Sequence, residues 1–212
     1  MDINQLLASS LNLETRLTKF LSLPLYDSSE RIKLSKIMCS IAFEHAESTK
    51  ILIASGNLTS ATGLVRLQYE ALVRAMWLRY SASDNAVSKL NSELSNDSAR
   101  RAANQLPTLT EMLTKLEGKA PAEAMELLIE FKEYSWKPLN SYVHGGIHAM
   151  NRHSKGYSLP LLVQVLKASN GVSTMVAMLL VILAGDTQQT GKIPSIQKEF
   201  SDCLPDIKVS TE

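Results

Sequence analysis

Residues 64–80, LVRLQYEALVRAMWLRY, are the most apolar helix-forming stretch that also carries charges, and these charged side chains recur at helical spacing. Arg66, Glu70 and Arg74 stand four residues apart, so a helix places them in one row along one face. If the row is exposed, its ion pairs only stabilise the helix, by roughly a few tenths of a kcal/mol per pair. If the row is removed from water, its excess positive charge favours an anion such as phosphate or carboxylate.

Whether this row faces the core or the solvent can be judged from the other residues of the same helix. At about 100° per residue, Trp77 falls beside the charged row, whereas Gln68 and Arg79 fall on the opposite side. If Gln68 and Arg79 mark the solvent face, the row points inward, where charges are costly unless they are paired or serve a site. We therefore expect a site along the charged row, with Trp77 beside it.

A second group of candidates lies near the histidines of the C-terminal half. Asn140, His144 and His148 stand at four-residue steps, so a single helix would place them on one face. Two histidines at this spacing can hold a metal ion, but no glutamate follows His144 in the HExxH manner, and a solvated polar face is the alternative. We predict no metal and no cofactor. The Gly145-Gly146 pair costs about 1 kcal/mol per residue within a helix, which favours close packing or a ligand there.

A third possibility joins the two groups. His45 falls among the apolar residues of a predicted helix over residues 30–55, either as a core histidine or as a functional one that faces the charged row. If the helix that carries His144 packs on residues 64–80, His45, Asn140 and His144 converge with the charged row on one pocket. A histidine beside fixed cations is the minimum for RNA cleavage without a metal, with the histidine as acid or base and a cation on the phosphate.

The composition favours one globular cytoplasmic domain. A chain of 212 residues with 45% hydrophobic content can bury a sizeable core, and a net charge of +1 gives no overall field that favours nucleic acid or an acidic membrane. Cys39 and Cys203 have no metal-ligand spacing, so we expect free thiols in a reducing compartment. Residues 1–20 lack the pattern of a secretory signal.

Helical periodicity extends along most of the chain, without strand patterns or internal repeats. The apolar run over residues 172–185 is shorter than the roughly 20 residues that span a membrane, so it predicts a core helix and no membrane contact. Pro138 should kink or restart the helix that begins near residue 122. The further helices are expected over residues 2–21, 27–55, 57–82, 106–116 and 159–184, with short helices or loops over residues 83–103 and a loop over 152–157.

These elements predict an all-α fold, an up-and-down-like helical bundle of about six or seven helices. Residues 1–190 are expected to form a single domain, followed by a C-terminal tail over residues 191–212 in which a short helix can form near residues 196–204.

Three blocks carry a resemblance: AFEHAES (residues 42–48), SATGLVRLQYEALVRAMWL (60–78) and LNSYVHGGIHAMNRHSKGY (139–157). They look like an uncharacterised family of bacterial helical proteins, which is more distantly similar to the HEPN superfamily. The resemblance implies a HEPN-like bundle, commonly dimeric and often a metal-independent RNase of toxin–antitoxin and phage-defence systems. The HEPN signature histidine matches His144. No arginine stands four to six residues before it, so Arg66 or Arg74 would take that role from another helix.

The resemblance implies a set of partners: a homodimer through the long helices, RNA, and an antitoxin or other defence protein. The residues expected to form the site are, for catalysis, His144, Arg66, Arg74 and Glu70, and, for substrate binding, His45, Asn140, His148 and Trp77. The alternative is a non-catalytic module that binds a partner protein or a small anionic ligand in the same pocket.

Overall fold

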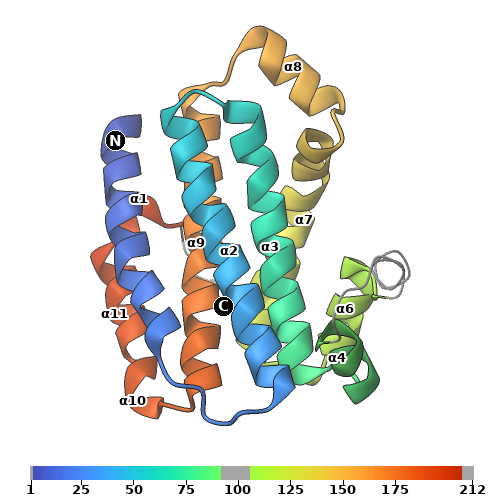
Figure 1. Ribbon diagram of the computed structural model, residues 1–212. Helices are drawn as coiled ribbons and strands as arrows, with labels where there is room; N and C mark the ends of the chain where they lie inside the picture. The colour runs from blue at the N-terminus through green and yellow to red at the C-terminus, as the bar shows by residue number, and fades with distance from the viewer. Residues whose placement is uncertain (1, 92–105, 207–212) are drawn as a thin grey trace, which may run out of the picture.

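The computed structural model describes residues 2–91 and 106–206, and within these ranges the chain is all-α, as predicted. The longest helices lie alongside one another and alternate in direction, which makes an up-and-down bundle (Figure 1). They are α1 (Ile3–Leu17), α2 (Glu30–Ala54), α3 (Leu58–Tyr80), α7 (Ala122–Val143) and α9 (Leu159–Ala184).

Shorter segments close the ends and one side of the bundle, so the described residues form more helical segments than the six or seven expected. In Figure 1, α8 lies across the end where α7 finishes, and α4 and α6 lie beside the second half of α3. The short segments are η1 (Thr18–Ser22), α4 (Asp84–Asn91), α6 (Leu109–Leu116), α8 (Ile147–Lys155), α10 (Thr187–Thr190), α11 (Lys192–Glu199) and η2 (Ser201–Cys203).

The central helix of the bundle is α3. It packs against α2, α6, α7 and α9, and within it only Ser60, in the first turn, is exposed. The aromatic side chains of Tyr69 and Trp77 are fully buried, and the Tyr69 hydroxyl donates to the Leu128 carbonyl of α7 at 2.7 Å. Apolar residues on nearly every side of α3 explain this position, because such a helix is stable only when it is surrounded.

Gln68 was expected to mark the solvent face of α3, and this prediction is wrong. Gln68 is fully buried against α9. Its Nε2 donates to the Ser169 carbonyl at 2.9 Å and to the Ser173 hydroxyl at 3.0 Å, and its Oε1 accepts from the Ser169 hydroxyl at 2.7 Å. Because the amide is bonded at both ends, its burial is tolerated, and the bonds set the rotation of α3 about its axis.

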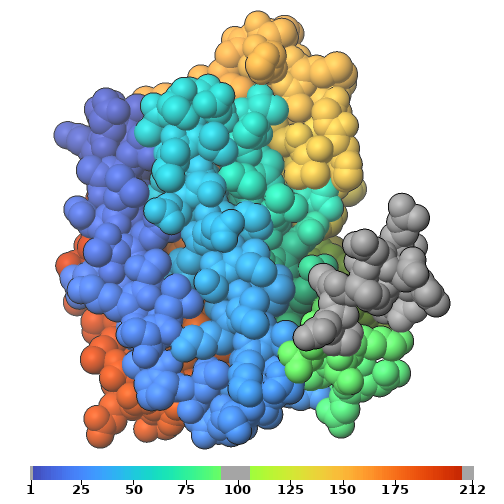
Figure 2. All heavy atoms as spheres, in the orientation of Figure 1, coloured from blue at the N-terminus to red at the C-terminus, as the bar shows by residue number. Residues whose placement is uncertain are grey.

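The apolar run over residues 172–185 lies in α9, which is a core helix as predicted. Among the described helices, α9 is long and apolar enough to cross a membrane, but 67% of its most apolar window is buried by the rest of the protein. Figure 2 shows that α1 and α2 cover α9 on the face in view. Asn170 is also buried there, donating to the Ser10 hydroxyl and the Cys203 carbonyl. This burial is the pattern of a core helix in a soluble protein.

Three local predictions differ from the structure. Of the two outcomes expected at Pro138, a kink or a restart, the restart does not occur: α7 is continuous through Pro138, which lies on the exposed side and removes only one backbone bond from a helix that packs along α3. Arg152 lies in α8 and not in a loop. The short helix expected near residues 196–204 begins earlier, as α11, and is followed by η2; α11 buries Ile193 and Ile196 against the bundle.

A buried ion pair joins α1 to α2. Lys50 is only 1% exposed, and its Nζ donates to Glu14 Oε1 at 3.1 Å and to the Ala46 carbonyl at 3.0 Å. Burial lowers the pKa of Lys50 and raises the pKa of Glu14, while the attraction between the two charges opposes both shifts. Removing one charge from such a pair costs more than replacing both, because the remaining charge stays buried without a partner.

We expect Lys50→Met to lower the free energy of unfolding by about 3–5 kcal/mol, because it leaves the Glu14 carboxylate unpaired. The control is Lys33→Met, which removes an exposed ion pair with Glu30 and should cost less than about 1 kcal/mol. Urea denaturation followed by circular dichroism measures both. The double variant Glu14→Leu/Lys50→Met should recover part of the loss, and a Lys50→Met protein as stable as the wild type would contradict this account.

Candidate functional site

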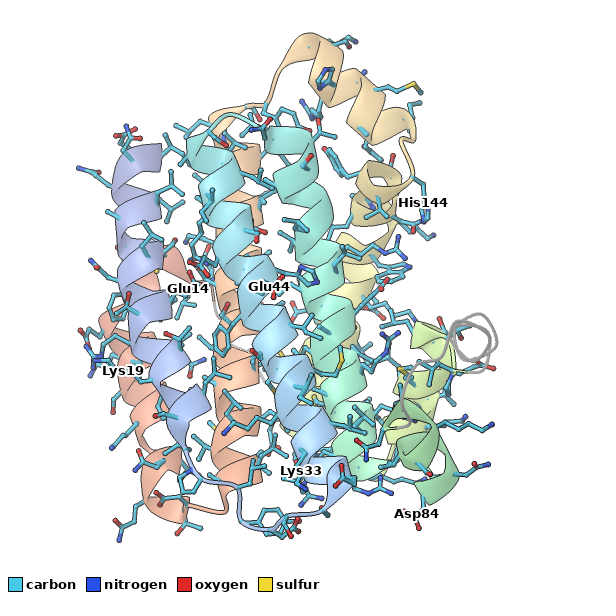
Figure 3. All side chains as sticks on the ribbon, in the orientation of Figure 1. Glu14, Lys19, Lys33, Glu44, Asp84 and His144 are labelled. Carbon is cyan, nitrogen blue, oxygen red and sulfur yellow. The ribbon has the colours of Figure 1, made fainter. Side chains whose placement is uncertain are left out.

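α3 and α7 bring Arg66 and His144 into direct contact, with 3.1 Å between Arg66 Nη1 and His144 Nε2. A guanidinium can only donate, so Nε2 accepts, and in this arrangement the imidazole is neutral and carries its proton on Nδ1. His144 is exposed and follows the last residue of α7, where its N–H donates to the Asn140 carbonyl at 3.2 Å (Figure 3). The pair therefore joins a solvent-accessible imidazole to a fixed cation.

Arg66 is held on several sides. Its Nη2 lies 2.8 Å from Glu70 Oε1, and its guanidinium carbon lies 4.5 Å from the centroid of a Trp136 ring. Its side chain is 14% exposed. The contact with the indole contributes about 0.5–2 kcal/mol in sites of this kind, and together with the carboxylate it restricts the guanidinium to one orientation. The cation is thus positioned before any ligand binds.

A cavity of about 260 Å³ opens beside this pair, between α3, α7 and the start of α6. Its lining contains two guanidinium groups and one carboxylate, so it has one positive charge in excess. Among the residues that the structure describes, Arg74 forms no hydrogen bond or ion pair, and its buried Nε has no partner. The lining residues are Arg66, Glu70, Arg74, Pro107, Thr108, Leu109, Thr110, Met112 and Trp136.

The start of α6 forms one wall of the cavity. The sequence predicted this helix, but its place at the site was not predicted. Thr108 and Glu111 form a capping box: Thr108 N–H donates to Glu111 Oε2 at 2.6 Å, and Glu111 N–H donates to Thr108 Oγ1 at 3.3 Å. The bonds that the Thr108 N–H and the Thr108 hydroxyl donate to the Glu111 carboxylate lower the pKa of Glu111. The Thr-x-x-Glu pattern is a recognised signal for a helix start and could have located this wall, although not its proximity to Arg74.

His45 belongs to the surroundings of the charged row. It is half-buried on α2, and burial lowers its pKa, whereas the Glu44 and Glu70 carboxylates oppose this shift. The electrostatic effect of Glu70 on the pKa of His45 indicates that His45, on α2, lies near the charged row of α3. The structure therefore brings His45 to the row and Arg66 to His144, and it places Asn140, half-buried, one turn before His144.

Trp77 lies away from the cavity. It is 2% exposed in the core of the bundle, and it is not among the cavity-lining residues. The indole at the cavity is instead Trp136, which sequence reasoning treated only as an apolar position of its helix. Trp77 was expected at the site because it lies near the charged row in angle around the axis of α3. That angle could not show which side of α3 the neighbouring helices leave open, or that Trp136 of α7 would lie there.

The expectation that His144 and His148 share a helix face is wrong. A turn at Gly145-Gly146 ends α7 and starts α8, so the histidines belong to different helices. Gly145 has φ +63°, a left-handed conformation that favours glycine, and a Cβ on Gly146 would lie 2.7 Å from Ser141 Oγ. That oxygen also accepts from the His148 N–H at 2.9 Å. The turn itself explains the glycine pair.

The side chains that could bind a metal ion do not gather at one place in the described part of the chain. Within residues 2–91 and 106–206, no three His, Cys, Asp or Glu side chains are grouped so that they could hold a metal ion. Cys39 and Cys203 are free thiols, as expected, and both are buried, which raises the pKa of each.

The fold and the site define an all-α bundle protein with a cationic cavity and an exposed arginine–histidine pair. A family model described as a family of unknown function (DUF6988) matches residues 39–206, so the chain belongs to this family. No curated protein and no solved structure matches the chain.

The lowered pKa of His45 predicts a pH dependence of stability. Because the folded protein binds this proton less readily than the unfolded chain, stability is complete above the ordinary histidine pKa of about 6.5 and falls as the pH decreases through the folded pKa. His45→Gln should flatten the decrease in urea midpoint between pH 7 and pH 5. His148→Gln, at an exposed residue, is the control and should retain the wild-type profile. Equal profiles for wild type and His45→Gln would refute the prediction.

Proposed function

We propose that this protein is a HEPN-like cytoplasmic bundle with an RNA-directed role in bacterial defence or stress response, as a metal-independent endoribonuclease or an RNA-binding protein. The observation that supports this function best is the 3.1 Å contact between Arg66 and His144, which come from different helices. A neutral, exposed imidazole beside a guanidinium is the pair of groups that phosphodiester cleavage without a metal requires.

The proposed reaction uses the two groups in separate roles. The phosphate of a bound strand takes over the Arg66 N–H that His144 accepts in the free protein, which frees His144 Nε2. The imidazole then removes the proton from the 2′-hydroxyl, whose oxygen forms a bond to phosphorus while the bond from phosphorus to the 5′-oxygen breaks. Arg66 balances the charge that develops on the phosphate oxygens. The 5′-oxygen takes up a proton from a solvent water as it leaves, and the resulting hydroxide is neutralised by the proton that His144 then releases.

Neighbouring residues position this pair. Glu70 binds the other end of the Arg66 guanidinium, and the Asn140 carbonyl accepts the His144 N–H at the end of α7. These contacts hold the two groups in place with little reorganisation during the reaction, which is the usual source of electrostatic catalysis in enzymes.

We expect His144→Ala to lower the rate of RNA cleavage by about 10²–10⁴, the usual contribution of a general acid or base, while the fold remains intact. His144 is exposed, so its removal leaves no buried cavity. His153→Ala, at another exposed histidine of α8 that is not among the proposed site residues, is the matched control and should cleave like the wild type. Gel analysis of a labelled single-stranded RNA, with EDTA present to exclude metal ions, measures the rates, and circular dichroism verifies the fold.

The unpartnered Arg74 in the cavity favours a second candidate, a non-catalytic module that binds a small anionic ligand or a partner protein. The two candidates differ in the same assay. If wild type and His144→Ala both leave RNA uncut, the enzyme proposal fails and the binding module remains.

A homodimer is part of the proposal, because the HEPN resemblance implies one. It is supported by apolar side chains that α7 and α8 leave exposed around His144: Val143, Ile147 at 73% and Met150 at 63%. Light scattering coupled to size-exclusion chromatography should give twice the chain mass, and Ile147→Glu should reduce it to one chain. An exposed Leu11→Glu variant on α1 is the control and should remain a dimer. A monomeric wild type would refute this part of the proposal.

A further inference from the structure

We infer that the cavity beside Arg74 is a separate binding subsite for a phosphoryl group, and that it holds the second phosphate of a strand whose other phosphate lies at the Arg66–His144 pair. The existence of the subsite is independent of the proposed function. The assignment of its phosphate to an RNA strand rests on the proposed function.

The first support is the difference between the two arginines of the cavity. Arg66 uses Nη1 for His144 and Nη2 for Glu70, and its ring contact with Trp136 holds it there. Arg74 lines the same cavity but has no hydrogen-bond or ion-pair partner within the described residues. A half-buried guanidinium without an anion is unfavourable, and a phosphoryl group satisfies it with charge-assisted hydrogen bonds.

The size of the cavity favours one phosphoryl group over a whole small molecule. Pockets for small-molecule ligands usually have about 300–1,000 Å³, and one water occupies about 30 Å³. The 260 Å³ here hold a group of several heavy atoms, while the rest of the ligand extends into solvent. This is the arrangement that one phosphate of a longer strand requires.

The start of α6 adds to the effect of Arg74. The N–H groups of Leu109 and Thr110 lie in the first turn, where no carbonyl within the helix can accept them, and both residues line the cavity. The positive end of the helix dipole points the same way. The Glu111 carboxylate, the negative charge nearest this turn on α6, is engaged by Thr108 in the capping box.

The two positions are distinct. Arg66 and Arg74 are two turns apart, which corresponds to about 12 Å along the axis of α3. Arg66 is oriented toward His144, and Trp136 packs on it at the edge of the cavity. A phosphate at Arg74 is therefore a different phosphate from the one at His144, and Glu70 lies between them on α3 to accept hydrogen bonds from a sugar hydroxyl or a base.

The first experiment titrates the wild-type protein with inorganic phosphate and follows the arginine Nε–H signals by NMR. The Arg74 signal, assigned by its loss in Arg74→Gln, should shift and saturate, and Arg74→Gln should abolish saturable binding. Arg79 is the matched control: its Nε is also buried without a partner, but it stacks on Tyr26 and Tyr80 outside the cavity. Arg79→Gln should bind phosphate like the wild type. An Arg74 signal that does not move would overturn the subsite.

The second experiment tests the strand assignment in the non-cleaving His144→Ala protein. Arg74→Gln should weaken binding of a trinucleotide with two phosphates by about tenfold, equivalent to about 1.4 kcal/mol, and leave a dinucleotide with one phosphate unchanged. Equal effects on the two RNAs, or no binding of either, would overturn the strand assignment. If phosphate still binds at Arg74, the subsite then serves a small phosphorylated ligand. Failure of the proposed function appears separately, as absence of RNA cleavage by the wild type.

Discussion

The buried amide of Gln68 is the contact on which the site depends. Its hydrogen bonds to Ser169 and Ser173 lock one side of α3 onto α9. Because α3 is surrounded by other helices, its rotation decides which residues reach the partly open strip between α6 and α7. With Gln68 against α9, that strip receives Arg66, Glu70 and Arg74, on the side of α3 opposite to the amide.

This geometry explains why a charged row is tolerated on a central helix. The three side chains are half-buried, in a boundary between helices, so they remain partly hydrated while neighbouring groups orient them. Arg66 pairs with Glu70, stacks on Trp136 and donates to His144, and only its Nε has no partner, whereas Arg74 has no hydrogen-bond or ion-pair partner among the described residues. One row thus contains an arginine held through both terminal nitrogens and one that is available, a combination suited to anion binding.

The sequence predicted much of the local structure and the convergence of some residues. The bounds of α2, α3 and α9 follow from capping residues, apolar periodicity and glycine stops, which act within a few residues. The meeting of Arg66 with His144 also agrees with the conditional prediction that their helices pack together. Two errors have different causes: contacts with α9 outweighed the local polarity of Gln68, whereas a local turn at Gly145-Gly146 separated His144 from His148.

The sequence by itself determined that the chain is helical, where α2, α3 and α9 begin and end to within a few residues, and which charged residues share a row, because hydrogen bonding and side-chain spacing along a helix are local. Only the tertiary structure decided that Gln68 faces the core, that Trp136 and not Trp77 lines the cavity, and that the start of α6 lies opposite Arg74. These features depend on the rotation and packing of helices distant in sequence, which pair polar groups that no local pattern connects.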